Sequence, residues 1–168
     1  MHPILSWLPV TLSTVGTTLA LVAFAYQVHR ARFNQSVDLL FRLENDFFGP
    51  AKRVQRAKAC RDLQGGNALE TEPILDFFET MALLLRRKAL DPEMVWHTFY
   101  YWIEGYYAAA SPHIQERQKM DPLVWKDLPQ LVTFLHAFNA KQHGKPTHPL
   151  SPEEIQAFLV EEQTEATI

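Results

Sequence analysis

Residues Ile4 to Tyr26, ILSWLPVTLSTVGTTLALVAFAY, form a run of 23 residues without a charged side chain. As an α-helix this run is about 34 Å long, enough to cross a hydrocarbon core of about 30 Å. Its apolar side chains favour insertion by roughly 3 to 6 kcal/mol, a gain that the interspersed serine, threonine, proline and glycine residues reduce. The run predicts an N-terminal transmembrane helix.

Two alternatives to a retained transmembrane helix are a cleaved signal peptide and a buried helix of a soluble protein. Ala23-Phe24-Ala25 matches the pattern that a signal peptidase prefers. However, no Lys or Arg precedes the run, which is also longer than the usual signal core. A basic cluster follows it directly, where it resists translocation. These features favour the retained helix.

The charge distribution predicts the orientation in the membrane. Residues 27–62 hold eight basic and four acidic side chains, a balance of +4, whereas the whole chain carries −3, which leaves −7 for residues 63–168. Basic segments beside a membrane stay in the cytoplasm. We therefore expect a protein of the bacterial inner membrane with its N-terminus outside and its C-terminal domain in the cytoplasm.

The basic side chains after the run form a predicted membrane-proximal group that suits anionic lipid headgroups. A topological flank without specific lipid contact is the alternative. Nucleic acid is not expected as a partner, because the body as a whole is acidic and no aromatic stacking platform interleaves with these charges. The group comprises Arg30, Arg32, Lys52, Arg53 and Arg56.

The remainder of the chain predicts an all-α fold: one transmembrane helix that continues into a cytosolic bundle of about five to six helices. We divide the chain into an anchor (1–27), a helical cytosolic domain (28–142), and a linker with a C-terminal helix (143–168). The single Cys60 excludes an internal disulfide and suits a reducing compartment. It lies among basic residues, where a lowered thiol pKa is one option and an ordinary half-buried helix position is the other.

Helix boundaries follow from local signals. The membrane helix is expected to continue as a rod to Gly49-Pro50, and a basic helix to end near Gly65-Gly66. Proline residues start helices near 73, 92 and 152, the last within a capping box at Ser151-Pro152-Glu153-Glu154. Ser111-Pro112 predicts a break before a short polar helix, and a further amphipathic helix is expected up to about residue 141.

Two surfaces are candidates for a partner. Small residues share one face of the predicted anchor and permit close approach of a second helix, although chance in a threonine-rich segment explains them equally. Tyrosines on the outer side of the helix from residue 92 are typical of protein interfaces, with burial against other helices as the alternative. The residues are Ser13, Gly16, Thr17 and Ala20 in the anchor, and Tyr100, Tyr101 and Tyr107 in the body.

No segment carries the signature of a reaction. The sequence lacks HExxH, CxxC, a G-x-S-x-G elbow and a phosphate-binding glycine loop. We therefore assign no catalytic, metal-binding or cofactor-binding residue, and an enzyme is the less favoured class. The alternative is a membrane-anchored enzyme with a helical cleft around Glu79, His97 and Glu104.

The order of several segments resembles a known family. A basic post-membrane helix precedes ILDFFETMALLLRRKALDPEMVW, the aromatic FYYWIEGYY, SPHIQERQK and VWKDLPQLV with Trp125. This order resembles small bacterial single-pass membrane proteins known only as a domain of unknown function, over roughly residues 5–138. The resemblance implies fold and topology and no chemistry.

Together these features predict a membrane-anchored helical protein that acts as a protein-interaction or scaffold module at the cytoplasmic face, with a protein partner or a second copy. An effector that oligomerises and perturbs the bilayer is a third option that the threonine-rich anchor permits.

Overall fold

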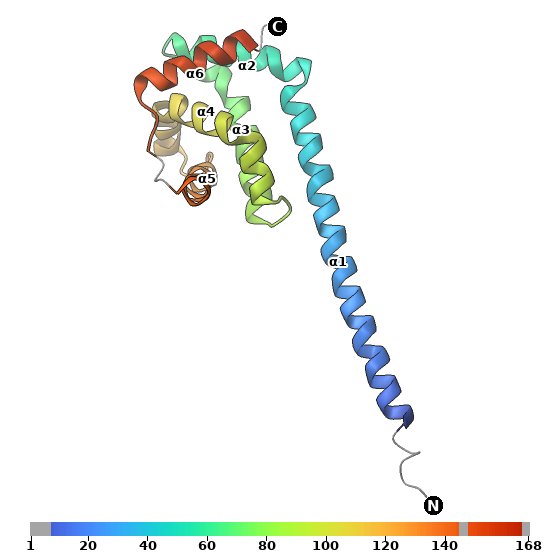
Figure 1. Ribbon diagram of the computed structural model, residues 1–168. Helices are drawn as coiled ribbons and strands as arrows, with labels where there is room; N and C mark the ends of the chain where they lie inside the picture. The colour runs from blue at the N-terminus through green and yellow to red at the C-terminus, as the bar shows by residue number, and fades with distance from the viewer. Residues whose placement is uncertain (1–7, 145–147, 166–168) are drawn as a thin grey trace, which may run out of the picture.

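The computed structural model describes residues 8–144 and 148–165, and the side chains of residues 19–144 and 148–164. Over these ranges the chain is all-α, as predicted, and Figure 1 shows the arrangement of its helices. The elements are α1 (Leu8–Phe48), α2 (Pro50–Gln64), the short 3-10 helix η2 (Leu69–Thr71), α3 (Glu72–Arg86), α4 (Pro92–Met120), α5 (Leu128–His143) and α6 (Pro152–Glu165).

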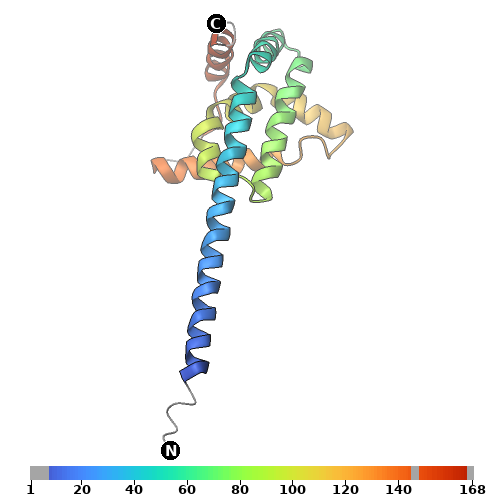
Figure 2. The same cartoon turned by 90° about the vertical axis from the view of Figure 1, so that its right-hand side faces the viewer.

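Helix α1 is one uninterrupted rod, as the sequence predicted. It runs for 41 residues, about 62 Å at the rise of an α-helix. Figures 1 and 2, taken at right angles, both show the other helices gathered about its C-terminal half while its N-terminal half projects clear of them.

Within the described part of the chain, no helix combines the length and the apolar character that a membrane span needs. The predicted span, residues 4–26, falls largely outside that part, because residues 1–7 and the side chains of residues 8–18 are not described.

The turn between α1 and α2 is tight at Gly49. A Cβ atom at this position would lie 2.8 Å from the carbonyl oxygen of Asn45, so the close backbone approach requires glycine. Pro50 then begins α2 with its ring in a position where no amide donor is needed. The basic helix therefore starts at the end of α1 farthest from the N-terminus.

Aromatic rings at the end of α1 and on α3 and α4 form the centre of the core. Phe47 is fully buried, and its ring lies 5.3 Å from that of Phe77 and 5.6 Å from those of Phe78 and Phe99. The pairs are stacked with Phe77, tilted with Phe78 and edge-to-face with Phe99, and such ring pairs add to the stabilisation that comes from burial. The C-terminal end of the rod is thus anchored in the body.

Helix α4 corrects one prediction. The chain does not break at Ser111-Pro112, because α4 is continuous from Pro92 to Met120 with Pro112 inside it. The proline removes one backbone hydrogen bond, but Ala110 and Ile114 on either side are buried in the core and hold both halves of the helix in place.

Helix α5 begins where a side chain from another helix supplies its cap. The carboxylate of Glu79 on α3 accepts hydrogen bonds from the backbone amides of Asp127 (3.1 Å) and Leu128 (2.8 Å). These amides have no partner inside α5, so Glu79 fixes the position of α5 on α3.

Helix α6 begins with the predicted capping box. The amide of Glu154 donates to Ser151 Oγ at 3.2 Å, and the amide of Ser151 donates to Glu154 Oε2 at 2.7 Å. The helix lies on α2 and α4. Its Phe158 ring sits directly on Gly105, where an added Cβ would meet ring atoms at 2.5 Å.

Candidate functional site

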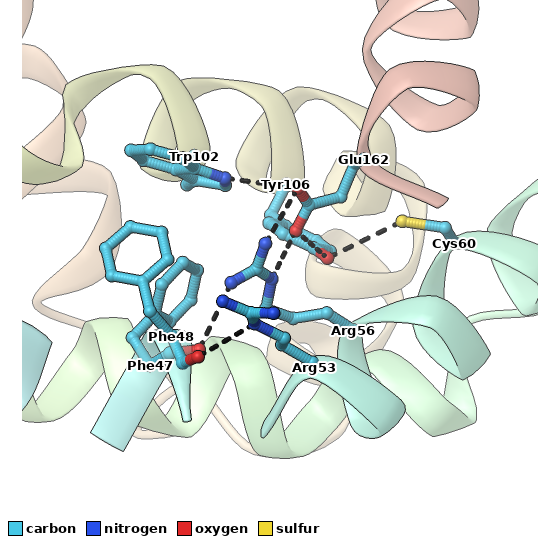
Figure 3. A network of polar contacts seen from close by, with 8 residues as sticks. All are labelled: Phe47, Phe48, Arg53, Arg56, Cys60, Trp102, Tyr106 and Glu162. Atoms are coloured by element: carbon cyan, nitrogen blue, oxygen red, sulfur yellow. Dashed lines mark hydrogen bonds and ion pairs between the residues drawn. The ribbon is translucent and has the colours of Figure 1, made fainter. Parts of the chain in front are cut away.

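The most concentrated polar cluster of the described chain surrounds the carboxylate of Glu162 on α6 (Figure 3). Its Oε1 accepts from Arg56 Nε at 2.5 Å and from the Tyr106 hydroxyl at 3.0 Å. Its Oε2 accepts from Arg56 Nη2 and from the Trp102 indole, both at 3.1 Å. Glu162 is 0% exposed and Arg56 2%, so the pair is sealed from solvent and bonded on both oxygens.

Arg56 also joins α2 to the end of α1. Its Nη1 donates to the carbonyl of Phe47 at 3.1 Å, and its guanidinium lies 4.5 Å from the centre of the Phe47 ring. The neighbouring Arg53 donates to the carbonyl of Phe48 at 2.9 Å. The last carbonyls of a helix lack donors inside it and carry partial negative charge, so the two arginines close α1.

Cys60 and Tyr106 complete the cluster, with Sγ and the hydroxyl oxygen 3.5 Å apart. Burial raises the pKa of Cys60 to about 11. Burial, and then the charge of Glu162, also raise the pKa of Tyr106 far above its ordinary value. Both groups are neutral at neutral pH. Cys60 is therefore fully buried and not the activated thiol that its basic neighbours allowed in the sequence.

The polar cluster is closed to solvent, and the hydrogen bonds of its carboxylate are all made within the chain. Its carboxylate is already bonded by four donors, and neither Arg56 nor Glu162 is open to a substrate. It connects the end of α1, the basic helix α2, the aromatic helix α4 and the C-terminal helix α6 at one point.

A second polar pair lies in a groove between α4 and α5. His136 Nε2 is 3.0 Å from Glu104 Oε1, and both line a cavity of about 380 Å³ together with Tyr107. Leu150, just before α6, and Ile155 on α6 also line this groove. The groove is partly open, and its carboxylate and imidazole are paired with each other.

The structure does not assemble the cleft that the enzyme alternative requires. Glu79 caps α5, where burial raises its pKa, Glu104 pairs with His136, and His97 is exposed beside the Trp96 ring. Within the described residues, no group of three His, Cys, Asp or Glu side chains could hold a metal ion.

The predicted membrane-proximal basic group is divided by the fold. Arg30 and Arg32 are exposed on α1, close to Tyr26. Lys52, Arg53 and Arg56 follow the end of α1, which lies about 33 Å beyond Tyr26 along the helix, and Arg56 is buried. The continuous α1 therefore separates the two parts of this group, and the lipid contact of its exposed members stays a prediction.

The three tyrosines proposed as a partner surface are used inside the chain. Tyr101 donates to Glu161 on α6 at 2.7 Å. The half-buried Tyr100 packs beside His136, and Tyr107 lines the groove, where burial raises its pKa. Tyr101 is nevertheless 43% exposed, whereas Tyr100 and Tyr107 are half-buried, and a partner surface on these residues stays a prediction.

The small-residue face of the anchor stays a prediction. Ser13, Gly16 and Thr17 belong to the part of α1 whose side chains are not described, and Ala20 is exposed.

Sequence reasoning missed Glu162, although a local signal was present. Phe158 and Leu159 mark the inward stripe of α6, and Glu162 lies one turn further on the same side. A carboxylate on a buried stripe implies a cationic partner, since an unpaired buried charge is strongly unfavourable.

Comparison with curated proteins and with solved structures finds no match. The sequence profile of one family, described as a domain of unknown function (DUF4760), matches residues 10–133. The match includes α2, α3, α4 and most of α1, and it ends within α5, before α6. The chain therefore belongs to the family of the domain of unknown function DUF4760.

Proposed function

We propose that this chain is a single-pass protein of the bacterial inner membrane that holds a helical interaction module at the cytoplasmic face. Ile4–Tyr26 is the anchor, the N-terminus lies outside, and the module binds a protein partner or a second copy. The observation that carries the proposal is the apolar, projecting N-terminal half of α1.

The described side chains of that half, from Leu19 to Tyr26, are exposed. Leu19, Leu21, Val22, Phe24 and Tyr26 are each 63–65% exposed, and at 100° per residue they point in all directions around the helix. A helix that is apolar all round is typical of a protein core or a membrane. The projecting half does not enter the core of this chain, so the bilayer is the environment that suits it.

The orientation is supported by the two arginines that follow. Arg30 and Arg32 lie about 6 and 9 Å beyond Tyr26 along the helix, within or beside the headgroup layer of a bilayer. Both are exposed. Basic residues at this depth favour the cytoplasmic side.

The best remaining partner surface is the outer face of α1 beside the body. Phe33 and Phe41 are 54% and 55% exposed and lie within about 80° of each other around the helix, so they share one face. Aromatic residues are enriched at the centres of protein interfaces. A partner that packs along this stripe would bind next to the membrane.

The anchor is tested by carbonate extraction of membranes that contain the full-length protein, with a reporter enzyme fused to its C-terminus. We expect the protein to stay in the membrane pellet and the reporter to be active only in its cytoplasmic form. Release into the soluble fraction, or a reporter active outside, would overturn the proposal.

The partner surface is tested by crosslinking in membranes with Phe33→Ser and Phe41→Ser. We expect these variants to lose crosslinked species that the wild type forms. The matched control is Leu123→Ser, because Leu123 is 69% exposed in the turn before α5. Equal crosslinking in all variants would exclude the stripe.

A further inference from the structure

The turn between α3 and α4 is the part of the body that lies nearest to the N-terminal half of α1 (Figures 1 and 2). It is fixed to the rod by a hydrogen bond from the Asp91 amide to Ser36 Oγ, at 2.7 Å. Ser36 is buried, and it follows Tyr26 by ten residues, or about 15 Å along the helix. With the anchor proposed above, this turn faces the membrane.

The turn carries basic side chains that are free of the rest of the described chain. Arg87 and Lys88 are exposed, and neither side chain makes an ion pair or hydrogen bond in the described structure. Arg86 beside them pairs with Asp127 at 3.0 Å and is half exposed. The acidic groups nearby are Asp91, whose side chain caps α4, and the exposed Glu93.

The same turn borders an apolar cavity. A cavity of about 210 Å³ lies between α3, the start of α4 and α5, and its walls include Leu85, Leu131 and Phe134. Arg86 and Pro92, the residues on either side of the turn, both line it. Phe134 is 45% exposed. The cavity is smaller than the usual site for a whole ligand, so it suits part of a molecule, such as one hydrocarbon chain.

We propose that this end of the body binds an anionic membrane lipid. The phosphate of the lipid lies on Arg87 and Lys88, and one acyl chain enters the cavity past Arg86. This inference rests on the proposed membrane anchor and names the ligand that the anchored body meets. It assigns the lipid contact to a turn that the predicted membrane-proximal group did not include, in place of α2.

The distances place the turn within the range of electrostatic attraction to the headgroup layer. A headgroup layer extends about 5 to 8 Å beyond the hydrocarbon core, which leaves roughly 10 Å between that layer and Asp91 when α1 stands upright. This gap is close to the Debye length at physiological salt. A tilt of about 20°, the average for transmembrane helices, narrows the gap on the side where the body lies.

The chemistry selects for an anionic amphiphile. A free anion would satisfy the two cations but leave the apolar cavity unused, whereas a neutral lipid would use the cavity but not the cations. Basic residues near an anionic bilayer each contribute a free energy that corresponds to about a fivefold change in binding.

The test uses the full-length protein in vesicles that contain a trace of phosphatidylglycerol or phosphatidylcholine with the same photoactivatable acyl chain. After irradiation, mass spectrometry locates the labelled peptides. We expect phosphatidylglycerol to label the peptides of Leu85, Leu131 or Phe134 about 25-fold more than phosphatidylcholine does, a factor of about five for each of the two basic residues. Both probes should label α1 equally, which reports insertion of the anchor independently.

The variant Arg87→Glu with Lys88→Glu should reduce the cavity labelling by phosphatidylglycerol to the phosphatidylcholine level, with unchanged helical circular dichroism. The matched control is Lys58→Glu with Arg61→Glu, the same charge change on exposed positions of α2 at the far end of the body. In this control variant, phosphatidylglycerol should label the cavity as strongly as in the wild type.

The outcomes separate the two proposals. Absence of α1 labelling with either probe would overturn the anchor. Labelled α1 with an unlabelled cavity, or a cavity labelled equally by both probes, would overturn the lipid site alone. Loss of labelling in the presence of inorganic phosphate would show that the site binds a free anion and would overturn the lipid as its ligand.

Discussion

Glu162 and Arg56 lie 106 residues apart in the chain, yet their side chains form a buried ion pair with two hydrogen bonds. Removing one partner of such a pair leaves an uncompensated buried charge and is strongly destabilising. The C-terminal helix is therefore an integral part of the fold, although the family match ends before it.

The first prediction concerns this pair. Glu162→Ala should lower the free energy of unfolding by about 3 to 5 kcal/mol, because Arg56 stays buried without its carboxylate. Thermal and chemical unfolding of the full-length protein in detergent, followed by circular dichroism, measures the change. Glu161→Ala is the matched control, since Glu161 is exposed and bonds only at the surface, and its effect should stay below about 1 kcal/mol.

Replacing both members of the pair by apolar residues gives a second arm of the same experiment. Arg56→Met with Glu162→Met should be less destabilising than Glu162→Ala alone, because no unpaired charge remains. If the double substitution instead lowered the free energy of unfolding by the sum of the two single-substitution effects, the packing of these side chains, rather than their charges, would be what holds α6.

The second prediction concerns Gly105 and Phe158. Gly105→Ala should destabilise by about 1 to 3 kcal/mol, because the new methyl group would meet the Phe158 ring at 2.5 Å. In the background of Phe158→Ala the same substitution should be nearly neutral, as a double-mutant cycle would reveal. Gly65→Ala serves as the control, since its added Cβ would make only contacts of 3.4 and 3.5 Å.

The third prediction concerns alkaline pH. The pKa of Cys60 is raised from 9.0 to about 11 in the folded protein. Below pH 9 both states hold the thiol proton, so stability does not change with pH through this group. Between pH 9 and 11 the unfolded state releases the proton first, so stability should fall by up to about 1.4 kcal/mol per pH unit.

Unfolding curves measured across this pH range check the effect, and Cys60→Ala should have the shallower pH dependence. The same burial predicts slow reaction of Cys60 with maleimide at pH 7 in the folded protein and fast reaction after unfolding. Rapid labelling without unfolding would contradict the sealed position of the thiol.

The fourth prediction concerns the anchor. Leu19→Arg with Val22→Arg should move the protein toward the soluble or aggregated fraction, because each arginine replaces an apolar side chain and opposes insertion by up to about 2.5 to 3.5 kcal/mol, with the smaller cost near the end of the span. Carbonate extraction measures the shift. Leu123→Arg, an equally exposed apolar position in the body, should leave the protein in the membrane.

The sequence predicts most helices because their ends depend on neighbouring residues. Asp91 caps α4 through the amides of Glu93 and Met94, as the Asp-Pro signal indicated, and the box at Ser151 starts α6. Such signals act over three or four residues and need no tertiary contact.

The missed features all depend on distant residues. Pro112 stays inside α4 because buried Ala110 and Ile114 outweigh one lost hydrogen bond. Glu162 and Arg56 meet only after α2 and α6 have packed together.

Because α1 is continuous, the length of the segment between Tyr26 and Ser36 determines how α2 to α6 are placed relative to the N-terminal half of the helix. One residue inserted there would swing α2 to α6 around the axis of the rod by about 100° and lift them by about 1.5 Å. Seven inserted residues would return them to within about 20° of their original orientation around the helix axis, but roughly 10 Å further along that axis. The length of this short segment therefore sets both the rotation of α2 to α6 around the helix axis and their distance along it from Tyr26.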